Sequence, residues 1–191
     1  MILAVAILLS ILVGFLRGGR LEGLASLRLR CGALAVAAFA LQTFFIYQKP
    51  AMRTAGGWGR QEIAFLSSYV LLCLTAWANR RQPGMALIGL GLLLNFAVMA
   101  ANGGWMPVTT EALSKAGYAH LAPSLVSGTR VYSTKDVLLR RGETRFWLLS
   151  DIFVLTKPFP LPAVFCIGDV AFALGALVLL QHGMLARRDG D

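Results

Sequence analysis

The sequence contains few charged residues: Asp, Glu, Lys and Arg together make up 14% of its 191 positions. A soluble domain has roughly a quarter of its residues charged, so this scarcity argues against a soluble protein. Apolar residues reach 57%, and the mean hydropathy is +0.68. We therefore expect an integral membrane protein, built as one transmembrane domain over residues 1–191.

Cysteine is scarce as well. The three cysteines lie in or beside apolar stretches and form no C-x-x-C pair: Cys31, Cys73 and Cys166. This pattern argues against a disulfide framework and a zinc motif. The chain has no glycine-rich phosphate loop, no serine–histidine pair and no ligand cluster with metal-site spacing. The sequence therefore predicts neither a metal ion nor a cofactor.

Acidic residues number nine against 18 Lys and Arg, which gives a net charge of +9. The basic residues lie in short clusters between apolar stretches. This arrangement orients membrane helices and is not typical of a nucleic-acid-binding surface. We expect membrane lipids as partners, with subunits of a larger membrane complex as a further alternative, and no nucleic acid.

Five apolar stretches approach the roughly 20 residues that a helix needs to cross a bilayer. They cover residues 2–16, 31–47, 63–78, 85–101 and 162–181. The apolar part of residues 146–160 is only about half as long as a span, and Lys157-Pro158 ends it. The expected fold class is therefore all-α, with about five transmembrane helices and a short re-entrant or interfacial segment. A shortened sixth span is the alternative.

The basic residues also predict an orientation, with the N-terminus outside and the C-terminus in the cytoplasm. The cytoplasmic side then receives Arg17, Arg20, Arg28, Arg30, Arg80, Arg81, Arg187 and Arg188. The outer side receives Lys49, Arg53, Arg60 and the loop 102–145. Within that loop, residues 110–121 predict a short helix resting on the membrane, and residues 21–29 predict an interfacial segment on the inner leaflet.

Two aspartates, Asp151 and Asp169, occur in apolar surroundings on either side of a proline-rich break. An ionisable group inside a membrane segment is costly and is therefore a candidate functional residue. We expect Asp169 about seven residues into the last helix. A turn that brings the two carboxyl groups together would let them share one proton.

Residues near this pair are candidates for orienting or binding groups. Amides can hydrogen-bond a carboxyl group in either protonation state, and glycines allow the backbone of a site-lining turn. The candidate orienting or binding residues are Asn95, Asn102, Gly103, Gly104, Arg145 and Lys157. The alternative is that each aspartate has only a structural role, in an ion pair or a hydrogen bond.

The chain resembles a family of bacterial multi-pass membrane proteins of unknown function. The resemblance rests on Asn102-Gly-Gly-Trp-Met-Pro-Val, on Asp151 after an apolar half-span, and on Ile167-Gly-Asp169 followed by Gly175. It covers most of residues 85–180. It implies a protein of the bacterial cytoplasmic membrane and supplies no activity.

The C-terminal third also looks distantly like lipoprotein signal peptidase, a membrane aspartyl protease. The stretches that carry this likeness are Asp151-Ile-Phe, Pro160-Leu-Pro and Phe165-Cys-Ile-Gly-Asp169. The family has asparagine and alanine where this chain has Cys166 and Gly168. The resemblance implies that Asp151 and Asp169 are a catalytic pair, one activating water and the other holding the proton.

Three functions remain open. The first is an aspartyl hydrolase that cleaves a lipid-linked or peptide substrate near the outer leaflet. The second is a non-catalytic accessory subunit or assembly factor. The third is a small transporter or lipid-binding protein, because a broken helix beside a buried acid is also found in carriers.

Overall fold

The computed structural model describes residues 2–48, 58–122, 124, 126–156, 158–159 and 162–186. This part of the chain is mostly helical and contains two small sheets. Its α-helices are α1 (Ile2–Leu16), α2 (Gly32–Ile46), α3 (Arg60–Ala78), α4 (Met85–Ala101), α5 (Thr110–Lys115) and α6 (Ile167–Leu185). Its short 3-10 helices are η1 (Leu21–Ser26), η2 (Ala119–Leu121), η3 (Arg141–Glu143) and η4 (Trp147–Leu149). Its strands are β1 (Met106–Val108), β2 (Asp136–Leu138), β3 (Phe153–Leu155) and β4 (Ala163–Phe165).

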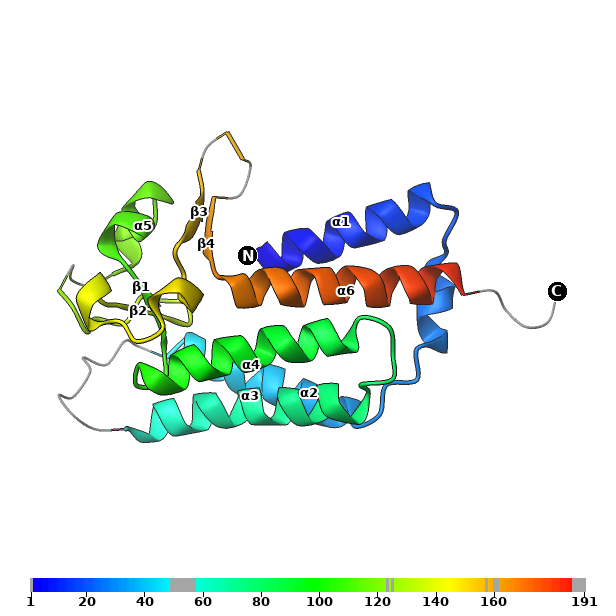
Figure 1. Ribbon diagram of the computed structural model, residues 1–191, viewed down its shortest axis with the longest axis horizontal. Coiled ribbons are helices and arrows are strands. Elements are labelled where there is room, and N and C mark those ends of the chain that lie inside the picture. The colour runs from blue at the N-terminus through cyan, green and yellow to red at the C-terminus, as the bar shows by residue number, and fades with distance from the viewer. Residues whose placement is uncertain are drawn as a thin grey trace.

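Five long helices lie side by side and form a bundle (Figure 1). α1 packs on α6, α6 on α4, α4 on α3, and α3 on α2. At one end of the bundle, near the start of α6, the strands and α5 form a cap. At the other end η1 packs against α6. The bundle therefore holds its polar loops and short elements at its two ends.

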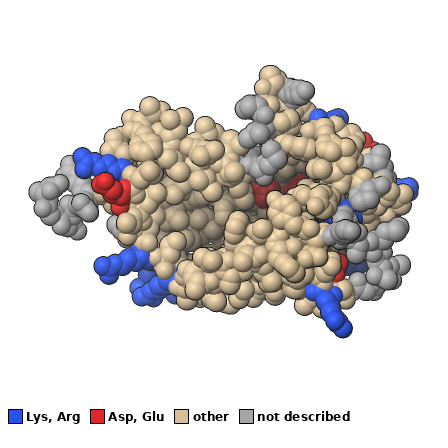
Figure 2. Space-filling view, turned by 180° about the vertical axis from the view of Figure 1, so that it is seen from behind, with Lys and Arg blue, Asp and Glu red and all other residues tan. Residues whose placement is uncertain are grey.

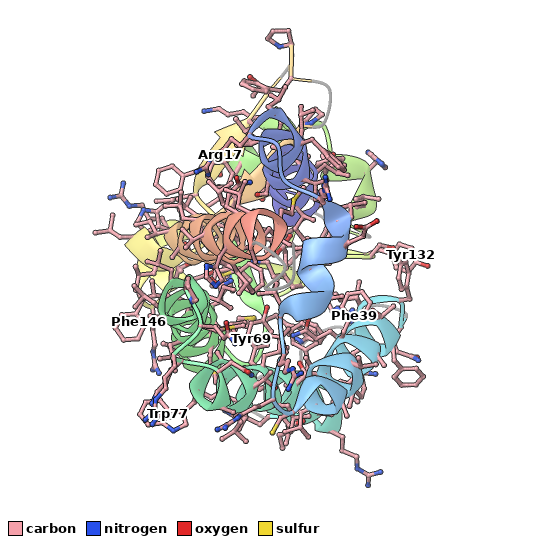
Figure 3. The ribbon with its side chains drawn as sticks, turned by 90° about the vertical axis from the view of Figure 1, so that its right-hand side faces the viewer. Arg17, Phe39, Tyr69, Trp77, Tyr132 and Phe146 are labelled. Atoms are coloured by element: carbon pink, nitrogen blue, oxygen red, sulfur yellow. The ribbon has the colours of Figure 1, made fainter. Side chains whose placement is uncertain are left out.

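The described residues form two apolar cores, and the first extends from the bundle into the cap through Met106 of β1 and Val137 of β2. Phe65, Tyr69 and Met99 belong to the first core, between α3 and α4. Figure 3 looks along the helices and shows Tyr69 inside the bundle, whereas Trp77 points outward. The second core lies in the cap, where Val108 of β1 packs with buried residues of α5 and β2.

The structure confirms a mostly helical fold, and α1 to α4 coincide closely with the first four apolar stretches. Two helices, α3 and α6, are long and apolar enough to cross a membrane, judged by length and composition alone. The predicted short helix at 110–121 is present as α5 and η2, with Thr109 as its cap: the Thr109 hydroxyl accepts a hydrogen bond from the Ala112 N–H at 3.2 Å.

The predicted start of the last helix at residue 162 is wrong. Residues 163–165 form β4, which pairs antiparallel with β3, so that Ala163 lies opposite Leu155 and Phe165 opposite Phe153. α6 begins only at Ile167. Asp169 is therefore in the first turn of the helix and not seven residues inside it.

The segment 146–160 contains no half-length helix among its described residues. It begins with the 3-10 turn η4 and continues into β3, and the β3–β4 hairpin stands out from the bundle (Figure 1). The stacked rings of Phe153 and Phe165, with centroids 5.5 Å apart, join the two strands. The expectation of an all-α chain is corrected accordingly, because these β-branched and aromatic residues pair as strands.

Glycines bring α4 and α6 close together. A Cβ atom built on Gly91 would lie 2.5 Å from the carbonyl oxygen of Gly168. A Cβ atom on Gly175 would lie 2.6 Å from the backbone nitrogen of Ile88. Backbone atoms cannot move aside as a flexible side chain can, so the contact requires glycine. Small residues allow such close helix packing.

We therefore predict that Gly91→Ala destabilises the protein by about 1–3 kcal/mol, the usual cost of overpacking. Gly89→Ala on the same helix is the matched control, since its Cβ atom would meet only the Cβ of Ala76, at 3.6 Å. Thermal unfolding of the purified variants measures both effects. Equal melting temperatures for the two variants would contradict the close α4–α6 contact.

Candidate functional site

The central strand of the cap brings together residues that are far apart in sequence. β1 pairs parallel with β2, with Met106 opposite Asp136, and the Met106 N–H donates to the Lys135 carbonyl at 2.9 Å. On the other edge of β1, the Pro107 carbonyl oxygen accepts a hydrogen bond from the Asp151 N–H at 3.1 Å. Asp151 and the Lys135-Asp136 pair therefore lie on the two sides of one strand.

Asp169 reaches the same place from α6. Cys166 caps this helix: its thiol accepts the Asp169 N–H at 3.4 Å, and Asp169 Oδ2 accepts the Cys166 N–H at 3.4 Å. The β3–β4 hairpin begins two residues after Asp151 and ends just before Cys166. The paired strands therefore hold both aspartates at the base of the hairpin.

Lys135 lies between the two aspartates. Its Nζ is 3.5 Å from Asp151 Oδ2 and 3.3 Å from Asp169 Oδ2. Asn95 of α4 donates from Nδ2 to Asp169 Oδ1 at 2.9 Å. Asp151 is 1% exposed and Asp169 5% exposed. The expected proximity of the aspartates is therefore present, with an ammonium group between them in place of a shared proton.

The cluster contains a third carboxyl group, that of Asp136. Burial, and then the charge of Asp151, raise the pKa of Asp136 to about 8. Burial also raises the pKa of Asp151, while the neighbouring Lys135 opposes this shift. Burial alone would lower the pKa of Lys135, but the two aspartates raise it well above its ordinary value. At neutral pH Asp136 therefore holds a proton and Lys135 stays charged.

Cys166 belongs to the same group of side chains. Its thiol donates to Asn95 Oδ1 at 3.0 Å. Asp151, Cys166 and Asp169 each offer one side-chain ligand atom, and these three atoms lie within 4.8 Å of one another. The Asp151 carboxylate also accepts a hydrogen bond from the protonated Asp136 carboxyl group. Figure 2 shows acidic side chains in a hollow near the middle of the rear face, among uncharged side chains.

A family model for a family of unknown function, DUF5317, matches residues 26–181. The chain belongs to the DUF5317 family. No curated protein and no solved structure matches it. The matched region contains every residue of the cluster and leaves out α1. Family membership confirms the expectation of an uncharacterised family and assigns no activity.

Of the orienting residues predicted for this DUF5317 protein, Asn95 contacts the site. Asn102 has another role: its amide donates to the carbonyl oxygens of Val98 and Arg145, and its Oδ1 accepts the Arg145 N–H, each at 2.8 Å. It thereby fixes the chain before η4 to the end of α4. Gly103 and Gly104 have φ angles of 79° and 95°, which glycine adopts without strain.

Of the two basic residues proposed as partners of the aspartates, the structure describes Arg145. Arg145 is exposed, and its backbone makes the contacts to Asn102. Lys157 lies outside the described residues. The cation that pairs with Asp151 and Asp169 is Lys135, from a polar stretch that the sequence pattern did not distinguish from an ordinary loop. Its only local signal is its place directly before β2, where Asp136 is followed by apolar residues.

We predict that Lys135→Met destabilises the DUF5317 protein by about 3–5 kcal/mol, because removing one partner leaves buried charge uncompensated. The matched control is Lys115→Met at the exposed end of α5, which should change stability by less than about 0.5 kcal/mol. Chemical or thermal denaturation of the purified variants measures the difference. If the two variants unfold alike, Lys135 does not hold the aspartates.

Proposed function

We propose that the chain is a five-span protein of the bacterial cytoplasmic membrane, with the N-terminus outside, the C-terminus in the cytoplasm and the cap on the outer side. Large apolar side chains on the outward faces of the bundle support this arrangement: Leu8, Leu12, Phe39, Leu90, Leu93, Leu174 and Val178 are exposed. An odd number of spans places the N-terminus and the C-terminus on opposite sides of the membrane. α1 and α2 have 15 residues each, so the bilayer must thin locally around them.

This topology can be tested with cysteine labelling in spheroplasts. Cys31 is exposed at the start of α2 and should face the cytoplasm. A membrane-impermeant maleimide should therefore label it only after the membrane is opened. The variant Cys31→Ser/Gly142→Cys carries a thiol in the exposed 3-10 turn of the cap and should react in intact spheroplasts. Labelling of Cys31 from outside would refute the orientation.

For the activity, we propose that Asp151, Lys135 and Asp169 hydrolyse a lipid-linked or peptide substrate near the outer leaflet. The observation that carries this proposal is that two buried carboxylates converge on one ammonium group where the bundle meets the cap. A base and a hydrogen-bond donor held at one point are what attack by water on a carbonyl group requires.

The two aspartates differ in their partners. Both oxygens of Asp169 accept hydrogen bonds, from Asn95, Lys135 and the Cys166 N–H. Asp151 pairs with Lys135 and hydrogen-bonds Asp136, and burial raises its pKa, which makes its carboxylate the more basic one. We therefore assign Asp151 as the base that takes a proton from the attacking water. Asp169 positions the Lys135 ammonium group, which donates to the oxygen of the carbonyl as it gains negative charge. The proton then passes from Asp151 to the leaving group as the bond to the carbonyl carbon breaks.

The predicted result is that Asp151→Asn lowers hydrolysis by about 10²–10⁴-fold, the usual contribution of a general base, with little change in fold because asparagine has the same shape. The probe is a quenched fluorescent peptide with a diacylglyceryl-modified cysteine, and the unmodified peptide shows whether the lipid is needed. Glu111→Gln on the exposed start of α5 is the control. Full activity of Asp151→Asn or Asp169→Asn would refute the catalytic pair.

The deep burial of Asp151 and Asp169 favours a second candidate, a non-catalytic membrane subunit. In that case the ion cluster only holds the cap on the bundle. The probe would then not be cleaved by the wild-type protein, and the protein would co-purify with partners in fixed stoichiometry. These results separate the two candidates. Asp169→Asn lowers the melting temperature in either case, because it breaks the buried ion pair with Lys135.

A further inference from the structure

A cavity of about 670 Å³ lies in the cap, bounded by the end of β2, the start of α5 and the short helices η3 and η4. Clefts that bind small molecules have volumes of roughly 300–1,000 Å³. The described residues that line this cavity include no member of the ion cluster of Lys135, Asp151 and Asp169. The cap therefore offers a second place for a ligand, separate from the proposed catalytic residues.

Two adjacent arginines, Arg140 and Arg141, line the cavity. Both ion pairs found among the described residues belong to the ion cluster, so neither guanidinium group is paired with a carboxylate. Glu143 also lines the cavity, but its carboxylate accepts hydrogen bonds from the Ser127 hydroxyl and from the Arg140 N–H. Glu111, the other carboxylate at the cavity, is exposed to solvent. Two guanidinium groups are thus available to an anion, and their forked donors match the oxygens of a phosphate group.

The Arg141 side chain is already held in place. Its guanidinium group lies over the ring of Trp147, 5.6 Å from the ring centroid, and Trp147 lines the same cavity. Stacking on an aromatic face engages the plane of the guanidinium group and leaves the N–H donors at its edge free. Arg141 is therefore oriented before any ligand binds.

The residues on either side of Trp147 indicate a lipid as the source of the phosphate. Phe146 is 60% exposed and Leu148 is 69% exposed. The backbone of Phe146 has a φ angle of 55°, in the left-handed region that costs free energy for a bulky side chain. An exposed ring recovers little of this cost by packing within the protein, whereas burial among acyl chains would recover it.

We propose that this cavity binds the headgroup of an anionic phospholipid of the outer leaflet. Arg140 and Arg141 hold the phosphate group, and Phe146 and Leu148 lie among the acyl chains. The choice of the outer leaflet rests on the proposed orientation, which puts the cap on the outer side. The site itself depends neither on that orientation nor on the proposed hydrolysis.

The test uses the full-length protein in micelles of an uncharged detergent, with three probes: dihexanoyl phosphatidylglycerol, dihexanoylglycerol and glycerol 3-phosphate. Native mass spectrometry counts the molecules bound and gives their affinity. We expect one phosphatidylglycerol per chain. Dihexanoylglycerol, which lacks the phosphate group, should bind at least about tenfold more weakly, because it loses the hydrogen bonds to charged groups. Equal binding of these two probes would overturn the proposal.

Arg140→Gln and Arg141→Gln should each weaken phosphatidylglycerol binding at least about tenfold. Both side chains are exposed, so the fold should be kept. Arg145→Gln is the matched control, because it removes the same charge from a nearby exposed side chain that does not line the cavity. It should cost at most about fivefold, the general attraction of one surface cation to an anionic lipid. Equal losses in the three variants would overturn the cavity as the binding site.

Phe146→Asn tests the lipid as the source of the phosphate. Asparagine adopts a positive φ angle more readily than phenylalanine, so this variant should keep the melting temperature of the lipid-free protein. It should weaken phosphatidylglycerol binding and leave glycerol 3-phosphate binding unchanged. If glycerol 3-phosphate binds the wild type as tightly as phosphatidylglycerol does, the ligand is a soluble phosphate ester and the lipid assignment is wrong. These measurements in micelles do not depend on the orientation, which labelling of Cys31 tests separately.

Discussion

The Lys135 ammonium group between Asp151 and Asp169 is the constraint on which the meeting of cap and bundle depends. Lys135 and Asp151 come from the cap, and Asp169 comes from the first turn of α6. A buried ion pair adds little net stability, because desolvation offsets the attraction, but breaking it leaves an unpaired charge. The cluster therefore fixes geometry: only one register of β1 on β2 and one placement of the hairpin bring all three groups together.

The helix bundle contributes to the site through close backbone packing. Gly91 and Gly168 let α4 and α6 approach until backbone atoms touch, and Asn95 lies one turn beyond Gly91 on α4. At this separation the Asn95 amide reaches both Asp169 and the Cys166 thiol. A wider helix spacing would leave these polar groups buried without partners. Gly91 on α4 thus determines whether Asp169 on α6 has its hydrogen-bond partner Asn95.

The sequence allowed the bundle to be predicted, because apolar stretches of near-membrane length are a strong local signal, and α1 to α4 follow them closely. It also indicated Asp151, Asp169 and Asn95, since polar residues in apolar surroundings are conspicuous. It did not indicate Lys135, Asp136 or the role of Cys166. Their positions depend on a parallel pairing of three-residue strands 30 residues apart and on a capped helix start, and neither leaves a periodic pattern.

The asymmetry between the two aspartates changes the chemistry that the sequence suggested. In a pair that shares one proton, two like charges at close range raise the pKa of one carboxyl group, so that one acid is protonated and the other ionised. Here the ammonium group between Asp151 and Asp169 removes the need for them to share a proton: Asp169 accepts from Asn95 and the Cys166 N–H, and Asp151 hydrogen-bonds the protonated Asp136. The proton of the cluster therefore belongs to Asp136 and Asp151, and not to Asp151 and Asp169.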